Sequence, residues 1–287
     1  MATVRATLAD ATAALAAAGI DSAALDARLL LADALALPAT RLLLEPMRVV
    51  SPAERQRFRR RLQRRLQREP VSRIRGEREF WSLPLAISAA TLDPRPDSET
   101  LVAAVLARCP APRRALDLGT GSGALILALA SERPQMTALG LDISLGALRV
   151  ARANAQRLGL AGRVRFAKGG WSDQRLVVPR GAGVFDLILS NPPYIATPDL
   201  AGLAPEVGFD PRTALDGGPD GLAPYRVILG DIGRALGPGG RVAFEIGLTQ
   251  GPAVADLCRQ AGLSEIEVLP DLGGRDRVVT ATRVGVG

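Results

Sequence analysis

The spacing of apolar residues divides this chain of 287 residues into two regions. Up to about residue 70, apolar side chains recur at three- and four-residue intervals, which is typical of helices with one buried face. From residue 114 onward, short apolar runs rich in branched residues alternate with helical segments. Strands that alternate with helices indicate a mainly parallel, doubly wound sheet. The pattern therefore predicts a small helical domain followed by an α/β domain.

The first region predicts a bundle of helices without strand-like alternation. Asp21 or Ser22 is a candidate N-cap for the second helix, and Ser51 precedes Pro52 and Glu54 in a pattern typical of a capped helix start. No group in this region is suited to chemistry, so we expect it to dock a partner. The predicted helices cover residues 8–18, 23–35, 40–44 and 52–68.

Aromatic and apolar residues broken by Ser82-Leu83-Pro84 predict a short hairpin that links the two regions. The proline-rich stretch 92–99 comes next, just before an apolar helix predicted over 100–108. Ser98 could cap that helix, or the rigid stretch could cover an active site. We therefore expect a helical domain over 1–75, a hairpin linker over 76–95 and a catalytic domain over 96–287.

A glycine-rich turn opens the α/β domain between a strand predicted over 114–118 and a helix over 124–131. Strand, glycine turn and helix in this order are typical of a nucleotide-type site, because glycine allows tight turning and close backbone approach. The spacing is neither that of a dinucleotide fingerprint nor that of a P-loop. Asp117, ahead of the turn, suits a positively charged ligand such as S-adenosylmethionine. The turn itself consists of Gly119, Thr120, Gly121, Ser122 and Gly123.

Two further predicted strands end in residues suited to an adenosyl ligand. Asp142 follows the strand 137–141, and a carboxylate there can accept hydrogen bonds from both ribose hydroxyls. Asp142 could instead cap the helix that follows over 145–158. Trp171 comes after the strand 164–167 and could stack on an adenine.

The fourth strand, predicted over 185–190, ends in Asn191, Pro192, Pro193 and Tyr194. Two prolines remove two N–H donors, so this segment offers mostly acceptors and an aromatic face. The Asn191 side-chain oxygen and the Pro192 carbonyl could each accept one hydrogen of a planar NH2 group. Such a site suits an amide or an adenine amino group, although Asn and Pro are also common in plain turns.

The rest of the chain completes the alternation of strands and helices. Residues 195–221 are rich in proline and glycine and form a loop long enough to act as a functional flap. We expect the final two strands to form an antiparallel edge. The predicted elements are a helix over 221–236, a strand over 241–246, a helix over 252–262 and strands over 265–269 and 277–283.

Charge and composition narrow the function. The net charge is +7, and eleven arginines lie between residues 55 and 78, a cluster that fits either a polyanionic partner or a solvated helix face. The chain has no histidine and two distant cysteines, Cys109 and Cys258, which excludes histidine triads and argues against a metal site or a disulfide scaffold. We expect buried thiols and, without an apolar run of roughly 18 residues, a soluble cytoplasmic protein without a membrane partner.

The glycine turn, Asp142 and the Asn191–Tyr194 segment, joined to a helical front domain and Pro94-Arg95-Pro96-Asp97, resemble the peptide chain release factor glutamine N5-methyltransferases. The resemblance implies a seven-stranded Rossmann-like domain that binds S-adenosylmethionine along Gly119–Gly123 and at Asp142, Trp171 and Asn191. It also implies that Asn191, Pro192, Pro193 and Tyr194 bind the glutamine of the Gly-Gly-Gln tip of class-one release factors. Asn191, Pro192 and Tyr194 would be the catalytic residues.

The chain departs from the family pattern at two positions. Gly170 stands where the family usually has an acidic residue, and Ala196 where it commonly has a polar residue or proline. The first departure puts a carboxylate contact to adenine in doubt.

Three other functions remain open from the sequence. A glutamine of a large-subunit ribosomal protein is an alternative substrate that the motifs do not exclude. A DNA or RNA adenine N6-methyltransferase is disfavoured, because the chain has no added recognition domain and few aromatic residues to hold a displaced strand. A non-catalytic adaptor is disfavoured because every residue that the chemistry needs is present.

Overall fold

The computed structural model describes residues 2–109, 111–172 and 175–285. The chain divides into two compact units. One consists of Met1–Glu77 together with Ala204–Phe209, and the other of Arg78–Leu203 together with Asp210–Gly287. A short piece of the predicted flap therefore belongs to the helical unit.

The helical unit confirms the predicted helices and adds a short fifth one. Ser51 and Glu54 form a complete capping box at the start of α4, as the sequence predicts. Ser22 occupies the N-cap position of α2, one of the two positions predicted, but its side chain makes no cap hydrogen bond. The helices are α1 (Val4–Ala17), α2 (Ala23–Leu35), α3 (Ala39–Leu44), α4 (Pro52–Leu66) and α5 (Val71–Arg75).

The predicted hairpin is present as strands β1 (Glu77–Phe80) and β2 (Leu83–Ala86). Trp81 and Ser82 form its tip with φ of 52° and 58°, the left-handed conformation that a two-residue hairpin turn requires. This conformation is costly for residues other than glycine. Trp81 offsets the cost by donating its backbone N–H to Glu99 and its indole N–H to Glu132, each at 2.8 Å.

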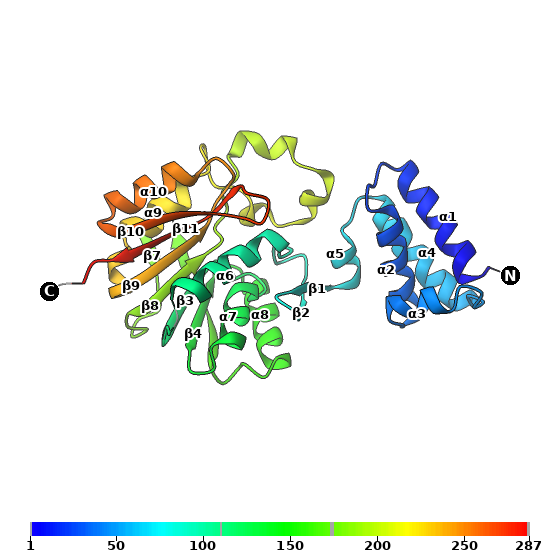
Figure 1. Ribbon diagram of the computed structural model, residues 1–287, viewed down its shortest axis with the longest axis horizontal. Helices are drawn as coiled ribbons and strands as arrows, with labels where there is room; N and C mark the ends of the chain where they lie inside the picture. Colours follow the sequence, from blue (N-terminus) through cyan, green and yellow to red (C-terminus); the bar gives the residue numbers. More distant parts are fainter. Residues whose placement is uncertain (1, 110, 173–174, 286–287) are drawn as a thin grey trace. The chain divides into compact units, whose positions relative to one another are not determined.

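The second unit contains the predicted seven-stranded sheet, in the order β10-β11-β9-β8-β3-β4-β5 (Figure 1). Strands β9, β8, β3, β4 and β5 are parallel, and β11 pairs antiparallel with both β9 and β10. The doubly wound fold and the antiparallel edge are thereby confirmed. The strands are β3 (Arg114–Leu118), β4 (Thr137–Asp142), β5 (Val164–Lys168), β8 (Phe185–Ser190), β9 (Leu236–Glu245), β10 (Leu263–Pro270) and β11 (Asp276–Arg283).

Helices cover both faces of this sheet, with α6, α7 and α8 on one face and α9 and α10 on the other (Figure 1). The central strand β8 is buried on both sides, since Leu187 and Leu189 pack in the first core and Ile188 in the second. This arrangement explains why the strand is a continuous apolar run. The helices are α6 (Glu99–Arg108), α7 (Ala124–Glu132), α8 (Leu145–Arg157), α9 (Ala223–Gly230) and α10 (Gly251–Gln260).

Four local details differ from the sequence predictions. The helix predicted over 221–236 is shorter, since α9 ends at Gly230 and a 3-10 helix, η5 (Ile232–Arg234), follows it. Strand β9 begins at Leu236 rather than at residue 241, because the glycine-rich stretch continues the strand as an irregularity between the pairs Phe185–Leu236 and Leu187–Arg241. A small hairpin of β6 (Gly170–Ser172) and β7 (Arg175–Val177) follows β5. The flap contains short 3-10 helices, namely η2 (Thr197–Gly202), η3 (Pro205–Phe209) and η4 (Arg212–Ala214).

Candidate active site

The carboxyl ends of three neighbouring parallel strands bring the predicted site residues together. Leu118, the last residue of β3, pairs with Leu141 of β4 on one side and with Ser190 of β8 on the other. The glycine turn, Asp142 and Asn191 follow these three positions directly. They therefore meet at one edge of the sheet, which is where open α/β sheets bind ligands.

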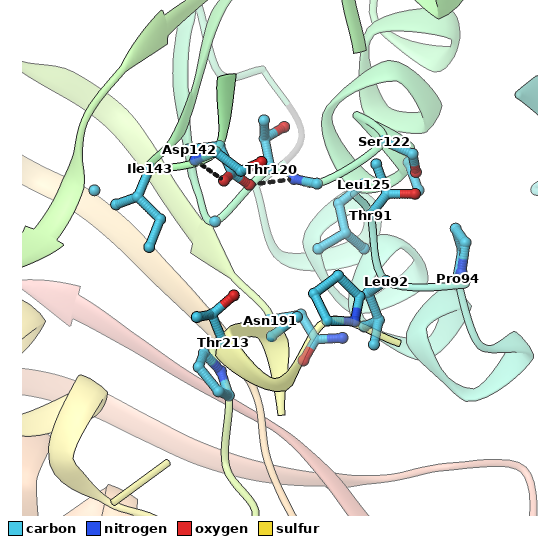
Figure 2. Close-up of a pocket in the computed structure, with 18 of the residues that line it drawn as sticks. Thr91, Leu92, Pro94, Thr120, Ser122, Leu125, Asp142, Ile143, Asn191 and Thr213 are labelled. Carbon is cyan, nitrogen blue, oxygen red and sulfur yellow. Dashed lines mark hydrogen bonds between the residues drawn. The ribbon is translucent and has the colours of Figure 1, made fainter. Parts of the chain in front are cut away.

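This edge contains a cavity of about 980 Å³ that is partly open to solvent (Figure 2). In Figure 2, Asp142 and Asn191 lie apart across the space. Of the predicted residues, Asp117, Gly123, Pro192 and Tyr194 do not line the cavity. Those that do are Gly119, Thr120, Gly121, Ser122, Asp142, Trp171, Asn191 and Pro193.

The glycines of the turn have a conformation that other residues rarely adopt. Gly119, Gly121 and Gly123 have φ of 74°, 57° and 84°. A Cβ atom at Gly119 would lie 3.0 Å from the Trp171 ring, so glycine here lets the indole pack closely over the turn. A Cβ at Gly123 would lie 2.9 Å from Leu127, so this glycine lets the turn pack closely on the helix that follows it.

Asp142 holds the glycine turn in place from the neighbouring strand. Its Oδ2 accepts a hydrogen bond from Gly121 N at 2.9 Å, and its Oδ1 accepts one from Ser144 N at 2.8 Å. Ser144 itself caps α8 by accepting from Ala147 N. Burial raises the pKa of Asp142, while the backbone hydrogen bonds at Ser144 and Gly121 act in the opposite direction. The carboxylate thus shapes the turn, and its remaining lone pairs stay available to a ribose.

Asp117 presents an acceptor that no described residue satisfies. Its Oδ2 accepts from the Thr120 hydroxyl at 2.5 Å, whereas its Oδ1 is buried without a hydrogen-bond partner in the described part of the chain. Burial raises the pKa of Asp117 to about 7, the Thr120 hydrogen bond lowers it, and the nearby Asp142 charge adds to the increase. An unpaired buried carboxylate oxygen beside a glycine turn fits a ligand that carries an ammonium or sulfonium group.

The orientation of Asn191 is set by a hydroxyl from the proline-rich stretch. Asn191 Nδ2 donates to Ser98 Oγ at 3.3 Å, so the donor end of the amide is engaged and the Oδ1 acceptor is left for the cavity. Ser98 ends the 3-10 helix η1 (Pro96–Ser98) and occupies the predicted N-cap position of α6. Its side chain makes no cap hydrogen bond to α6.

The alternative prediction, that stretch 92–99 covers the site, is supported by the cavity lining. Leu92, Pro94 and Ser98 face the cavity, and so does the end of the flap at Pro211, Thr213 and Ala214. Asp210 of the flap connects the two segments, because its carboxylate accepts hydrogen bonds from Asp93 N at 3.0 Å and from the Arg95 guanidinium at 2.6 Å.

Sequence reasoning missed several residues that line the cavity, because nothing in their local pattern marks them. Ile143 and Leu125 contribute apolar surface, and Thr91 and Thr213 contribute hydroxyls. Each comes from a loop or a helix start whose position depends on the tertiary fold.

Gly170 lines the same cavity and has a φ of 132°. An L-amino acid rarely adopts this conformation, so an acidic residue at this position would need a different local backbone. The departure from the family pattern is thus accompanied by a specific backbone conformation, and no carboxylate is provided here.

The remaining expectations concern cysteines, metals and membranes. Both cysteines are free thiols, but only Cys258 is fully buried, while Cys109 is partly buried. No group of three potential metal ligands occurs within the described residues. None of the helices in that part of the chain is long and apolar enough to cross a bilayer.

Comparisons with known proteins agree with this geometry. Residues 6–76 match the family model of the PrmC N-terminal domain, and residues 112–258 match a methyltransferase domain.

Solved structures share the fold of the second unit. The match to a methyltransferase from Pyrococcus furiosus covers 71% of this chain and 90% of that protein, at 20% identity and with a TM-score of 0.52. The hMettl16 catalytic domain, solved in complex with a 3′UTR hairpin, covers 72% of this chain and 78% of its own at 16% identity, with a TM-score of 0.60. The fold and the site define an S-adenosylmethionine-dependent methyltransferase.

Curated relatives narrow this class to one family. Proteins named release factor glutamine methyltransferase from Agrobacterium fabrum and Moorella thermoacetica are 44% and 43% identical to this chain and cover 98% of it, and the chain covers 98% and 99% of their lengths. A protein of the same name from Rhodospirillum rubrum is 48% identical over 94% of this chain and 82% of its own length. The chain belongs to the release factor glutamine methyltransferase family.

Proposed function

We propose that this protein transfers a methyl group from S-adenosylmethionine to the side-chain amide nitrogen of the glutamine in the Gly-Gly-Gln motif of class-one release factors. One observation carries the proposal. Asn191 donates to Ser98 and so keeps its amide oxygen as an acceptor, across the cavity from the Asp142 side of the cofactor cradle (Figure 2).

The residues present fit the cofactor. Asp117 Oδ1 is a buried carboxylate oxygen without a hydrogen-bond partner among the described residues, so it suits a cationic group of the cofactor. The Asp142 carboxylate has lone pairs that can accept hydrogen bonds from the ribose hydroxyls. The Gly119 backbone and the Trp171 ring form an edge of the cavity suited to a flat base. When bound, S-adenosylmethionine supplies a methyl group activated by the positive charge of its sulfur.

Asn191 and its neighbours would prepare a poor nucleophile. The lone pair of an amide nitrogen is delocalised into its carbonyl, so the nitrogen needs orientation rather than a strong base. Asn191 Oδ1 and the Pro192 carbonyl would each accept one hydrogen of the substrate NH2 group. Two fixed acceptors aim the nitrogen at the methyl group and stabilise the positive charge that develops as the new N–C bond forms. One N–H proton then leaves to solvent.

The composition of the chain favours an amide substrate over a base in a nucleic acid. Only 3% of its residues are aromatic, which leaves few rings on which a displaced strand could stack. The relatives named above act, by their names, on release factors. We assign the docking of the protein partner to the helical unit, which matches the model of the PrmC N-terminal domain.

A substrate panel tests the proposal. Purified class-one release factor, large-subunit ribosomal protein and DNA are each offered with isotope-labelled S-adenosylmethionine, and any methyl group is mapped by mass spectrometry. We expect one methyl group on the glutamine of the Gly-Gly-Gln motif and none on the other two substrates. Methylation of the ribosomal protein or of adenine, with the release factor unmodified, would overturn the assignment.

A further inference from the structure

A fully buried asparagine in α8 has no part in the mechanism described so far. Asn154 is 0% exposed and lies among buried apolar residues of the helix, where an amide is costly unless it is hydrogen-bonded. Its Oδ1 accepts a hydrogen bond from Ala86 N at 2.8 Å. Its Nδ2 donates to Ala86 O at 3.0 Å and to Ser122 O at 2.9 Å. Both amide hydrogens and the amide oxygen are therefore used.

These hydrogen bonds join two segments that are distant in the sequence and that both line the cavity. Ser122 belongs to the glycine turn and faces the cavity itself (Figure 2). Ala86 ends β2, and residues 87–91, the entry segment, follow it and line the cavity with Ala90 and Thr91. The asparagine is thus a common support of the glycine turn and of the entry segment.

The glycine turn is held from two sides. On the β4 side, Gly121 N donates to Asp142 at 2.9 Å. From α8, Asn154 fixes the carbonyl of the next residue, Ser122. Neighbouring peptide groups of the turn are therefore fixed by two different elements, and the loss of either support should give the turn more freedom.

The entry segment is a tight turn that also packs on α8 at a second point. Thr91 Oγ1 donates to Ser88 O at 3.1 Å and accepts from Ser88 N at 3.2 Å. A Cβ atom at Gly146, the second residue of α8, would lie 2.7 Å from the Cβ of Ala90, so glycine here allows a close approach. A shift of this segment at Ala86 should therefore displace the residues that line the cavity.

We propose that Asn154 is a positioning residue for S-adenosylmethionine, which holds the glycine turn and the entry segment in the arrangement that binds the cofactor. Asn154 does not line the cavity, so it acts through these two segments. This role rests on the proposed function through its cofactor, and it does not depend on which substrate is methylated. Without the support, the turn would occupy the binding arrangement only part of the time, and the apparent affinity would fall by that fraction.

Calorimetry with S-adenosylmethionine on Asn154→Ala tests the proposal. Alanine removes all three hydrogen bonds but has the higher helix propensity, so α8 itself should remain helical. We expect the dissociation constant to rise about tenfold, which corresponds to a turn that occupies the binding arrangement about a tenth of the time. In the protein without cofactor, amide hydrogen exchange over residues 119–123 should be faster than in wild type.

Arg163→Met is the matched control for a purely structural role. The Arg163 guanidinium also makes three hydrogen bonds to the backbone, at 2.8 to 3.0 Å. The acceptors are the carbonyls of Ala130, Arg133 and Met136. Arg163 precedes β5 at the amino end of that strand, whereas the cavity lies at the carboxyl ends of the strands. This variant should have a lower unfolding temperature and an unchanged dissociation constant for the cofactor.

Gly146→Ala tests the entry segment without altering Asn154, and it decides the question if Asn154→Ala does not fold. The added methyl group would collide with Ala90 and displace the entry segment, so cofactor affinity should fall although alanine favours the helix. Adding Ala90→Gly removes the opposing methyl group. The double variant should therefore return to within about twofold of the wild-type dissociation constant.

The outcomes distinguish this role from the proposed function. A wild-type protein that binds no S-adenosylmethionine would contradict the function itself. If the wild type binds it, a folded Asn154→Ala with unchanged affinity would overturn the positioning role alone, and so would an equal loss of affinity in Arg163→Met. Where Asn154→Ala does not fold, unchanged affinity in Gly146→Ala, or no recovery with Ala90→Gly, would overturn it.

Discussion

At the scale of single residues, the site depends on which end of a side-chain amide faces the cavity. Asn191 is half-buried at the tip of β8, with its NH2 group engaged by Ser98. A polar group at a strand tip adds little to the packing of the core. Its contribution should therefore appear in turnover rather than in stability.

The first prediction concerns Asn191→Ala and Asn191→Asp. The alanine variant removes the acceptor and should lose on the order of 10² to 10³ in kcat, as when one oriented polar group is removed from an active site. The aspartate variant keeps an acceptor but cannot donate to Ser98, and it adds a negative charge, so it should also be slow. Single-turnover methylation and thermal unfolding on the same preparation check this. A destabilised but fully active alanine variant would mean that the segment is only a turn.

The second prediction concerns the pH dependence of cofactor binding at Asp117. Its pKa is raised to about 7 without a ligand, and a cation beside Oδ1 must lower it. Binding then displaces a proton, so affinity for S-adenosylmethionine should increase as pH rises from 5.5 to 7.5, by at most about tenfold per pH unit. Calorimetry across this range measures the slope.

Asp117→Asn provides the control for this pH dependence. It should bind the cofactor more weakly and with a flatter profile, since asparagine carries no titrating proton. An unchanged slope in the variant would assign the effect to another group, with Asp142 the next candidate because its pKa is also raised.

At the scale of elements, α4 carries one buried arginine among several that are exposed or partly exposed. Arg65 is buried on this helix, where it pairs with Asp26 of α2 at 2.7 Å and with Glu206 at 3.0 Å. Glu206 also pairs with Arg68, at 2.8 Å. The ion pairs of Glu206 with Arg65 and Arg68 thus hold the segment Ala204–Phe209 in the helical unit.

The third prediction is that Asp26→Ala destabilises the helical unit strongly. Removing Asp26 takes from Arg65 its buried partner and leaves Glu206, which also pairs with Arg68, so we expect a loss of about 2 kcal/mol. The exposed pair Arg41–Glu45 provides the control, because Glu45→Ala should change stability by less than about 1 kcal/mol. Urea unfolding followed by helical circular dichroism compares the two. If both variants lost a similar free energy of unfolding, the burial of the Asp26–Arg65 pair would not add to its contribution to stability.

At the scale of the whole molecule, the arginine cluster remains in part a free charged surface. Arg59 and Arg60 are exposed on α4, whereas Arg61 and Arg64 pair with Asp33 and Glu69. Exposed charges act over roughly 8 to 10 Å at physiological salt, so they affect association more than the affinity of the final complex.

The fourth prediction is that the double variant Arg59→Glu, Arg60→Glu slows methylation of intact release factor. We expect kcat/KM to fall by about tenfold at low salt and the difference from wild type to shrink as ionic strength rises. A short glutamine peptide should react at the wild-type rate. Arg180→Glu, an exposed charge reversal in the other unit, serves as control. Equal losses on protein and peptide would argue against a docking role for this surface.

Local sequence signals predicted the elements well, but not their exact ends. The alternation of strands and helices gave the doubly wound sheet, and the capping box marked the start of α4. The strand predicted from residue 241 begins at Leu236 instead, because pairing with β8 outweighs the low strand propensity of the glycine-rich stretch. Ser22 and Ser98 have cap-forming side chains, but neither makes the cap bond.

The sequence by itself determined the groups that end each strand of the site. A strand consists of apolar residues where it is buried, and polar residues or glycines follow where the chain leaves the sheet. The glycine turn, Asp142 and Asn191 are therefore visible in the sequence as ends of apolar runs. Only the tertiary structure decided which of them share a cavity and what orients them. Ser98 and Asn191, 93 residues apart along the chain, are joined by a hydrogen bond, and Tyr194 and Glu245, 51 residues apart, are joined by another because β9 lies beside β8. Strand order depends on how the helices cover the two faces of the sheet, and hydrophobic periodicity carries no information about it.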